Sequence, residues 1–183
     1  MVKIKENTKL EKRRVSFKKK RKTIVFDLDQ TLIYGEHLKK RHYYKFHFRP
    51  GLIKLLNKLS KYYNLAIFTA SRKSYANTVI NLIEKKNAFF TKIFTKDDTT
   101  EIGEHKHVKD LKKFNIPLKN ILIIDDNPIS YFFQKSNGLK APSYTGEKND
   151  KFLKVILNML LKYFDEINMK KIIKNIKNQL KNI

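Results

Sequence analysis

The sequence predicts an α/β fold in which a parallel, Rossmann-like sheet is flanked by helices on both faces. Three observations predict it: short apolar runs recur along the chain, segments of helical periodicity separate them, and several of the runs end in polar residues. Parallel strands need a crossover connection, usually a helix, so this alternation favours a parallel sheet. With 183 residues, 41% of them hydrophobic, the chain can build one domain with its own core.

The apolar runs are predicted to be buried strands. They are rich in Ile, Leu, Val and Phe and show little polar alternation, which is typical of parallel strands covered on both faces. The fourth run is the most apolar and ends in two consecutive acids. The four predicted strands are residues 23–27, 65–69, 91–94 and 121–125.

Helical periodicity fills most of the connections. Pro50 and Gly51 open one helix, whose Leu side chains recur at three- and four-residue spacing. The segment 32–48 instead alternates aromatic and basic residues, which predicts a small β-hairpin that forms a flap. The polar stretch 95–107 carries no clear periodicity. The other predicted helices are residues 72–87, 108–114, 149–165 and 168–182.

The charge is concentrated at the two ends of the chain, and the net charge is +24. We expect three regions: a basic arm (residues 1–22), a catalytic domain (23–167) and a basic C-terminal helix (168–183). Such a charge suits phosphate-rich partners, so the arm is a candidate for nucleic-acid binding. Lys is far more abundant than Arg, however, and the codon bias of an AT-rich genome explains that composition equally well.

Other classes are excluded by composition. The chain has no Cys, which removes disulfides, thiolate metal sites and every cysteine-nucleophile mechanism. No segment has the roughly 20 apolar residues of a transmembrane helix, and no secretory signal is evident. We therefore expect an intracellular protein, nuclear or cytoplasmic, with the basic run 18–22 as a candidate nuclear localisation signal. The sequence indicates no oligomeric state.

Acidic residues stand where two predicted strands end. Asp27 ends the first strand and Asp29 follows it, and Asp125 ends the fourth strand and Asp126 follows it. In a parallel α/β sheet, ligands bind beyond the carboxyl ends of the strands, so we expect these acids to share one site. Clustered carboxylates repel one another when ionised and need a cation, and oxygen-only ligands suit Mg²⁺.

Two further polar residues fall at the same expected edge. Thr69 ends the second strand, and Lys109 precedes the fourth. A hydroxyl donor and an ammonium group are suited to holding phosphoryl oxygens. A helix cap or turn explains any single Asp after a strand, but it does not explain the whole ordered set. The set provides a nucleophile, an acid/base, a metal site and a phosphate clamp.

These segments resemble the four motifs of the haloacid-dehalogenase superfamily. The segment 27–32 resembles motif one, Thr69 with Ser71 motif two, Lys109 motif three, and Asp125-Asp126 motif four. The finer resemblance, over roughly residues 22–165, is to the small phosphatases of the RNA polymerase II C-terminal domain and the nuclear LIM interactor-interacting factors. The segments that carry it are 48–51, 68–76, 108–111, 124–130 and 137–138.

The resemblance implies a mechanism and a set of roles. Asp27 would be the nucleophile that forms an aspartyl-phosphate, and Asp29 the general acid and base. Mg²⁺ would bind Asp27, the Asp29 carbonyl and Asp126, with Asp125 supporting that shell. Thr69 and Lys109 would hold the transferring oxygens. The expected substrate-binding residues are Thr69, Ser71, Lys109, Arg49 and Tyr75.

The connections also bear on the substrate. Members of the superfamily that act on small molecules often enclose the site with an inserted cap domain, but segments 32–48 and 95–107 are too short to hold one. We therefore expect an uncapped site and a phosphoprotein substrate carrying phosphoserine or phosphothreonine, with the polymerase tail as one option. Two alternatives remain: a phosphatase of nucleic-acid ends or nucleotides, and a non-catalytic binding or import relative.

Overall fold

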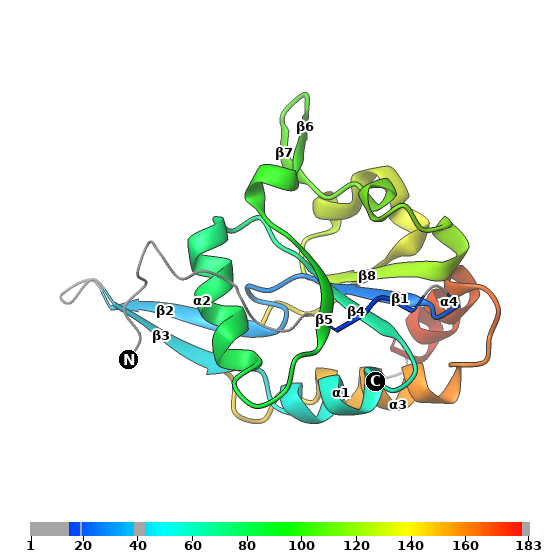
Figure 1. The fold of residues 1–183 in the computed structure, drawn as a ribbon, viewed down its shortest axis with the longest axis horizontal. Helices are drawn as coiled ribbons and strands as arrows, with labels where there is room; N and C mark the ends of the chain where they lie inside the picture. Colours follow the sequence, from blue (N-terminus) through cyan, green and yellow to red (C-terminus); the bar gives the residue numbers. More distant parts are fainter. Residues whose placement is uncertain (1–14, 19, 39–42, 181–183) are drawn as a thin grey trace.

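A five-stranded parallel sheet forms the centre of the protein (Figure 1). The computed structural model describes residues 15–18, 20–38 and 43–180. The strand order is β5-β4-β1-β8-β9, and every neighbouring pair is parallel. The predicted sheet is confirmed. Its strands are β1 (Thr23–Phe26), β4 (Asn64–Phe68), β5 (Phe90–Phe94), β8 (Ile121–Asp125) and β9 (Gly138–Lys140).

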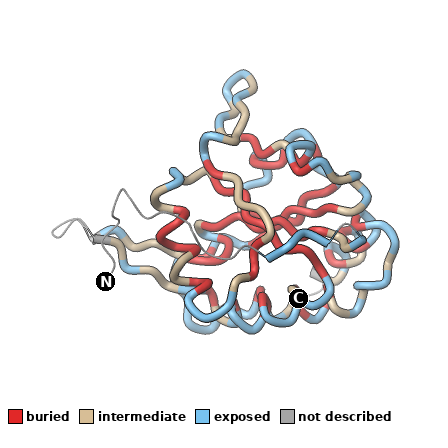
Figure 2. The backbone as a smooth tube through the Cα atoms, in the orientation of Figure 1, coloured by how far each residue is buried: buried red, intermediate tan, exposed pale blue. Residues whose placement is uncertain are grey.

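Side chains of the three central strands alternate between two hydrophobic cores, as the two-residue period of a strand requires. In β1, Val25 enters one core, whereas Ile24 and Phe26 enter the other. The whole of β1, β4 and β8 is buried, and Figure 2 shows this red centre. Burial on both faces explains why the strand sequences lack polar alternation.

The two faces of the sheet carry different kinds of helix. The larger core is covered by α1 (Leu52–Leu59), α2 (Lys73–Ile83), α3 (Phe152–Lys162) and α4 (Met169–Leu180). The smaller core is covered by the 3₁₀ helices η3 (Leu111–Phe114) and η5 (Pro128–Asn137). The remaining 3₁₀ turns are η2 (Lys96–Asp98) and η4 (Leu118–Asn120). The predicted helix 108–114 is wrong in type and extent, because Val108 ends a strand and only residues 111–114 are helical.

Two antiparallel hairpins extend from the sheet in different directions (Figure 1). The predicted flap is confirmed as β2 (Ile33–Leu38) paired with β3 (Tyr43–Phe48). The second hairpin, β6 (Thr100–Ile102) and β7 (His105–Val108), was not predicted, since its strands are short and polar. Within the described residues, these hairpins occupy the places where a cap domain could be inserted.

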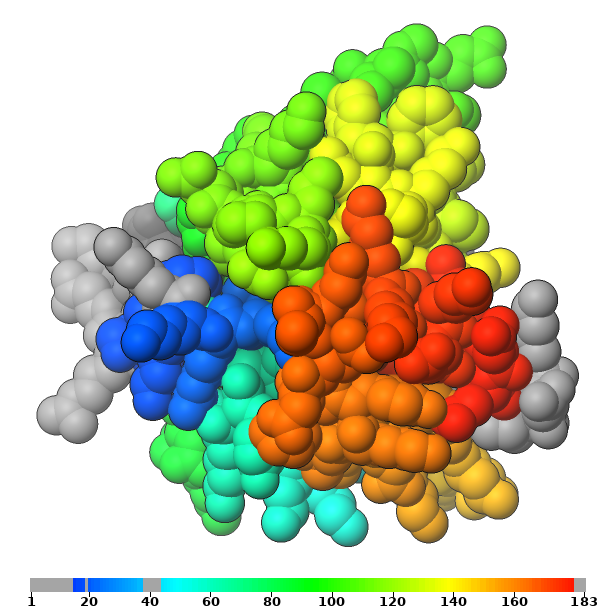
Figure 3. All heavy atoms as spheres, turned by 90° about the vertical axis from the view of Figure 1, so that its right-hand side faces the viewer, coloured from blue at the N-terminus to red at the C-terminus, as the bar shows by residue number. Residues whose placement is uncertain are grey.

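Both ends of the described chain pack against the domain. Met169, Ile172 and Ile176 of α4 are buried in the larger core, and Figure 3 shows α3 and α4 side by side on one flank. The backbone of Lys18 exchanges hydrogen bonds with the Asn64 side chain. The last residues of the basic arm are therefore fixed, whereas residues 1–14 and 19 lie outside the described part. Among the described helices, none is long and apolar enough to cross a membrane.

Candidate active site

A pocket of about 310 Å³ lies at the carboxyl ends of β1, β4 and β8. It collects residues that are more than 80 positions apart in the chain. The pocket contains all of the predicted site residues except Arg49 and Tyr75. Its lining consists of Asp27, Asp29, Gln30, Thr69, Ala70, Ser71, Lys109, Asp125, Asp126, Asn127 and Ser130.

The loop after β1 aims Asp27 and Asp29 into this pocket. Leu28 between them is fully buried in the core, so its neighbours project the other way. Gln30 then adopts a left-handed conformation (φ 58°) that turns the chain back toward β2. Thr31 is also buried, and its hydroxyl oxygen accepts a 3.2 Å hydrogen bond from the Asp126 N–H. The first acidic loop is thereby fixed to the loop that carries the second acidic pair.

Lys109 bridges the two acidic loops from inside the protein. Its Nζ lies 2.6 Å from Asp27 Oδ1 and 2.6 Å from Asp125 Oδ2, and all three side chains are buried. Burial alone would lower the pKa of Lys109, but the two carboxylates outweigh it and hold the pKa above its usual value. Lys109 therefore stays a cation in a water-poor site, where its charge acts strongly on whatever anion approaches.

The acids outnumber the cations here, and that imbalance fits a metal ion. Asp27, Asp125 and Asp126 each offer a carboxylate oxygen, and these oxygens lie within 4.8 Å of one another. Burial raises the pKa of Asp27 to about 7, an effect that Lys109 opposes and Asp125 reinforces. One ammonium group does not neutralise three carboxylates, and an all-oxygen donor set suits a hard divalent cation. The residues present therefore fit a divalent metal, with Asp126 as the solvent-facing member.

Asp29 has a different environment, although it is only two residues from Asp27. Its Oδ2 accepts a 2.7 Å hydrogen bond from Ser71 Oγ, and its Oδ1 accepts a 2.5 Å hydrogen bond from the Tyr75 hydroxyl. Burial and the Asp29 charge raise the pKa of Tyr75 far above its usual value, so Tyr75 remains a hydrogen-bond donor. The Asp29 carboxylate lies outside the three-acid cluster, and ligation through its backbone carbonyl stays a prediction. Ser71 and Tyr75 hold Asp29 through these bonds, and their contact with substrate stays a prediction.

Thr69 is placed as predicted, at the end of β4 and beside the pocket. Its backbone N–H donates to Phe94 O, and its side-chain oxygen accepts from the Ser71 N–H at 3.0 Å. The bond from Ser71 fixes the side-chain oxygen, and the described contacts include no acceptor for the Thr69 O–H. Thr69 and Lys109 therefore both place a side-chain donor at the pocket.

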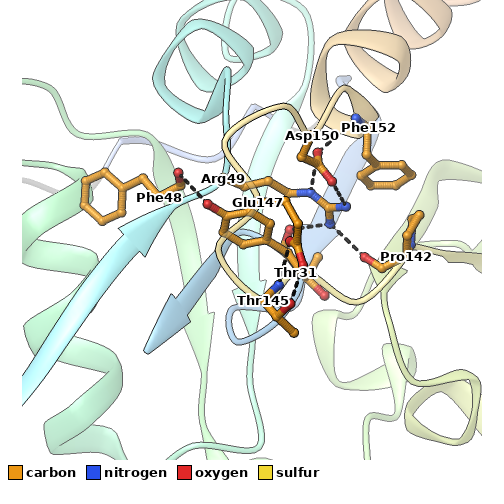
Figure 4. Close-up of polar contacts among 9 residues, drawn as sticks. Thr31, Phe48, Arg49, Pro142, Thr145, Glu147, Asp150 and Phe152 are labelled. Atoms are coloured by element: carbon orange, nitrogen blue, oxygen red, sulfur yellow. Dashed lines mark hydrogen bonds and ion pairs between the residues drawn. The ribbon is translucent and has the colours of Figure 1, made fainter. Parts of the chain in front are cut away.

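Arg49 does not belong to this site, which corrects the prediction that it binds substrate. Its side chain is fully buried and makes a two-pronged ion pair with Asp150, with distances of 2.8 and 2.7 Å (Figure 4). It also donates to Thr31 O and Pro142 O and stacks on the Phe152 ring. Arg49 ties the loop after β1 to the segment before α3. Its acidic partner is 101 positions away, so no local pattern could reveal it.

Two further residues contact the acidic cluster in a role that the sequence did not predict. Ser143 Oγ donates to Asp126 Oδ2 at 2.6 Å, and Asn127 N–H donates to Asp125 Oδ1 at 2.9 Å. These contacts orient the acids of the cluster. Asn127 could have been noticed, since an Asn before Pro128 is a typical helix cap. Ser143 lies in a loop without a recognisable pattern.

Comparison with known proteins agrees with this geometry. The family model described as NLI interacting factor-like phosphatase matches residues 22–173. Nuclear envelope morphology protein 1 of Schizosaccharomyces pombe is 31% identical over 165 residues, covering 80% of this chain and 34% of that protein. CTD small phosphatase-like protein 2 of Dictyostelium discoideum is 32% identical over 145 residues (72% and 25%). The import translocase subunit TIM50 of Candida glabrata is 31% identical over 134 residues (73% and 27%). The chain thus spans about a quarter to a third of these relatives.

Solved structures share the fold. The RNA polymerase II CTD phosphatase Fcp1 superposes with a TM-score of 0.59 at 23% identity, covering 84% of this chain and 52% of that one. A 3-deoxy-D-manno-octulosonate 8-phosphate phosphatase from Moraxella catarrhalis gives 0.53 at 18% identity, with coverage of 80% and 91%. The sheet order, the acids at its edge and the match over residues 22–173 agree, and the chain belongs to the NLI interacting factor-like phosphatases of the haloacid-dehalogenase superfamily.

Proposed function

We propose that the chain is a Mg²⁺-dependent phosphatase that removes phosphate from phosphoserine or phosphothreonine of a protein through an aspartyl-phosphate on Asp27. The observation that carries the proposal is the contrast between Asp27 and Asp29. Asp27 lies against Lys109 and the acidic cluster, whereas Asp29 is held by two hydroxyl groups. Two carboxyl groups in unlike environments beside one pocket are suited to separate roles in catalysis.

In the first step, an Asp27 carboxylate oxygen attacks phosphorus and the bond from phosphorus to the serine or threonine oxygen breaks. Asp29 gives its proton to that leaving oxygen. Thr69 and Lys109 hold the equatorial oxygens during transfer. In the second step, Asp29 takes a proton from water, whose oxygen attacks phosphorus. The bond to Asp27 breaks, which frees phosphate and restores both acids.

A divalent cation suits the acids Asp27, Asp125 and Asp126, which would hold it. When bound, it supplies positive charge against the phosphoryl group and the carboxylates. Ser143 and Asn127 hold Asp126 and Asp125 in the orientation that the cluster needs. Loss of the metal should therefore reduce turnover without unfolding the site.

The protein substrate is supported by the uncapped pocket. Hairpins of a few residues per strand replace the large insertions that would enclose a small molecule. A phosphorylated side chain on a folded or extended chain can enter from solvent. The relatives named as CTD phosphatases agree with this substrate class.

Two other functions have specific support. The net charge of +24 favours nucleic-acid ends or nucleotides as substrates. The similarity to TIM50, a mitochondrial import translocase subunit, favours a binding role without turnover. The presence of Asp27, Asp29, Thr69, Lys109 and Asp126 in one pocket favours catalysis over that second alternative.

The test is hydrolysis of p-nitrophenyl phosphate by the wild type, Asp27→Asn and the control Asp97→Asn, with Mg²⁺ or with EDTA. Asp97 is exposed on η2 and outside the pocket. We expect Mg²⁺-dependent turnover that Asp27→Asn abolishes and Asp97→Asn preserves. Metal-independent turnover, or full activity of Asp27→Asn, contradicts the mechanism. A tenfold preference in kcat/KM for phosphorylated oligonucleotides over phosphopeptides, about 1.4 kcal/mol, contradicts the protein substrate.

A further inference from the structure

Three large apolar side chains lie exposed on η5. Ile129, Phe132 and Phe133 are 44%, 36% and 43% exposed, and the two phenyl rings lie 6.3 Å apart. Single exposed apolar residues are common on protein surfaces, but three of them within five positions form a patch, and such patches mark interaction sites. We call these three residues the η5 surface.

The three residues of the η5 surface are not needed to hold η5 on the domain, because other residues of the segment do so. Gln134 accepts from the Leu111 N–H at 3.0 Å and donates to Asp110 Oδ1 at 2.7 Å. Asn137 donates to Ile121 O at 2.7 Å, and the Tyr131 ring fills the space beside Gly138. The inward side chains of η5 thus pack on or hydrogen-bond to the domain, whereas its outward side chains contact solvent.

The η5 surface lies close in the chain to two residues of the catalytic pocket. Asn127 and Ser130, on either side of Ile129 in the chain, both line that pocket. Consecutive Cα atoms are about 3.8 Å apart, so the Cα atoms of Phe132 and Phe133 lie within roughly 8 and 11 Å of that of Ser130. An extended peptide covers such a distance with two to four residues.

A lysine and a histidine border the η5 surface. Lys135 Nζ lies 4.5 Å from the centre of the Phe132 ring, and the His105 ring of the β6–β7 hairpin lies 5.3 Å from it. Two aromatic side chains of the flap, in contrast, pack against another residue of the domain. Tyr44 and Phe46 pack edge-on against Tyr75 and support Asp29 through it. Among the exposed aromatic residues, Phe132 and Phe133 stand within three positions of the pocket-lining Ser130, and they are therefore available to a chain bound there.

We propose that the η5 surface binds a bulky apolar side chain of the phosphoprotein substrate, located two to four residues from the phosphorylated residue. The proposal rests on the proposed function and specifies its substrate class. Burying such a side chain against two phenyl rings supplies binding energy that a small phosphate ester cannot use. Lys135 disfavours Lys or Arg at the same substrate position.

The first test needs no mutation. Phosphoserine peptides that carry Leu, Lys or Gly at one position at a time, from four before to four after the phosphoserine, are compared with the wild type and Mg²⁺. We expect Leu at one or two positions within that range to raise kcat/KM about tenfold over Gly, mainly because KM falls. Lys at the same positions should lower kcat/KM. Equal kcat/KM at all positions overturns the proposal.

The second test compares Phe132→Ala/Phe133→Ala with Tyr62→Ala/Phe164→Ala. The control removes two exposed aromatic rings 5.1 Å apart, outside the pocket lining. We expect the η5 variant to lose the Leu preference while it hydrolyses p-nitrophenyl phosphate within about twofold of the wild type, and the control to keep both. An unchanged preference in the η5 variant, or an equal loss on both substrates, overturns the proposal.

The outcomes separate this proposal from the proposed function. A wild type that hydrolyses p-nitrophenyl phosphate but no phosphopeptide refutes the protein substrate, and with it this surface. A wild type that hydrolyses phosphopeptides without any apolar preference refutes the surface alone. Sedimentation velocity tests whether a second copy of the chain occupies the η5 surface instead. If the wild type is a dimer, the η5 variant is a monomer and the peptide kinetics of the two are the same, the surface is a dimer interface and the proposal is overturned.

Discussion

The Tyr75 hydroxyl donates a 2.5 Å hydrogen bond to Asp29 Oδ1, and so ties helix α2 to the loop after β1. Ser71 occupies the other carboxylate oxygen at 2.7 Å. A carboxylate held at both oxygens has one orientation, which a general acid needs if its proton is to reach the leaving oxygen. Tyr75 thus acts on the proposed chemistry through Asp29.

Tyr75→Phe should lower kcat for p-nitrophenyl phosphate by about tenfold, because a hydrogen bond to a charged group contributes roughly 1.5–3 kcal/mol and only part of it is specific to the transition state. KM should change little, since Tyr75 does not line the pocket. Steady-state kinetics with Tyr62→Phe, an exposed tyrosine, as the control measure this. A raised KM with unchanged kcat would instead place Tyr75 among the substrate contacts.

Gly35 of the flap should influence the same hydrogen bond. A Cβ atom at position 35 would lie 2.6 Å from the Tyr75 hydroxyl oxygen, too close for the present geometry. The Tyr75 ring has little room to retreat, because Tyr44 and Phe46 pack against it. Gly35→Ala should therefore lower kcat as Tyr75→Phe does, and the double variant should lose no more than either single variant. Additive losses in a double-mutant cycle would contradict this coupling.

Lys109→Met should destabilise the metal-free protein strongly. It leaves Asp27 and Asp125 buried without their cation, and removing one partner of a buried ion pair costs about 3–5 kcal/mol. Mg²⁺ should stabilise this variant more than the wild type, because a bound cation restores positive charge beside the same acids. Urea unfolding with EDTA and with Mg²⁺ measures both effects, with exposed Lys119→Met as the control. If Lys109→Met and the wild type had equal unfolding free energies in EDTA, the stabilising role of the ion pairs of Lys109 with Asp27 and Asp125 would be refuted.

Much of the site could be predicted because strand ends determine it. Once residues 23–27 and 121–125 are read as parallel strands, Asp27, Asp29 and Asp125 must meet at one edge of the sheet. The predicted strands and flap were confirmed for the same reason: period and composition are local properties of the sequence. The β9 strand was missed because three residues starting at Gly138 carry no such signal.

Roles that depend on distant partners could not be predicted in this way. The family resemblance of segment 48–51 placed Arg49 among the substrate-binding residues, but its guanidinium pairs with Asp150, 101 residues later. The hydrogen bonds of Ser71 and Tyr75 to Asp29 were not predicted, since they depend on how α2 packs on the sheet. Side-chain pairing of this kind follows from tertiary packing, which no local pattern encodes.

Arg49→Lys should lower the free energy of unfolding while kcat and KM for p-nitrophenyl phosphate stay within about threefold of the wild type. Lys keeps the charge but cannot reproduce the two-pronged contact with Asp150 or reach Thr31 O and Pro142 O together, so we expect a loss of about 1–3 kcal/mol. Urea unfolding and steady-state kinetics on one preparation separate the two effects. Arg21→Lys is the control, because its guanidinium makes one described hydrogen bond, to Ser60 O. A tenfold rise in KM at unchanged stability would return Arg49 to the substrate site.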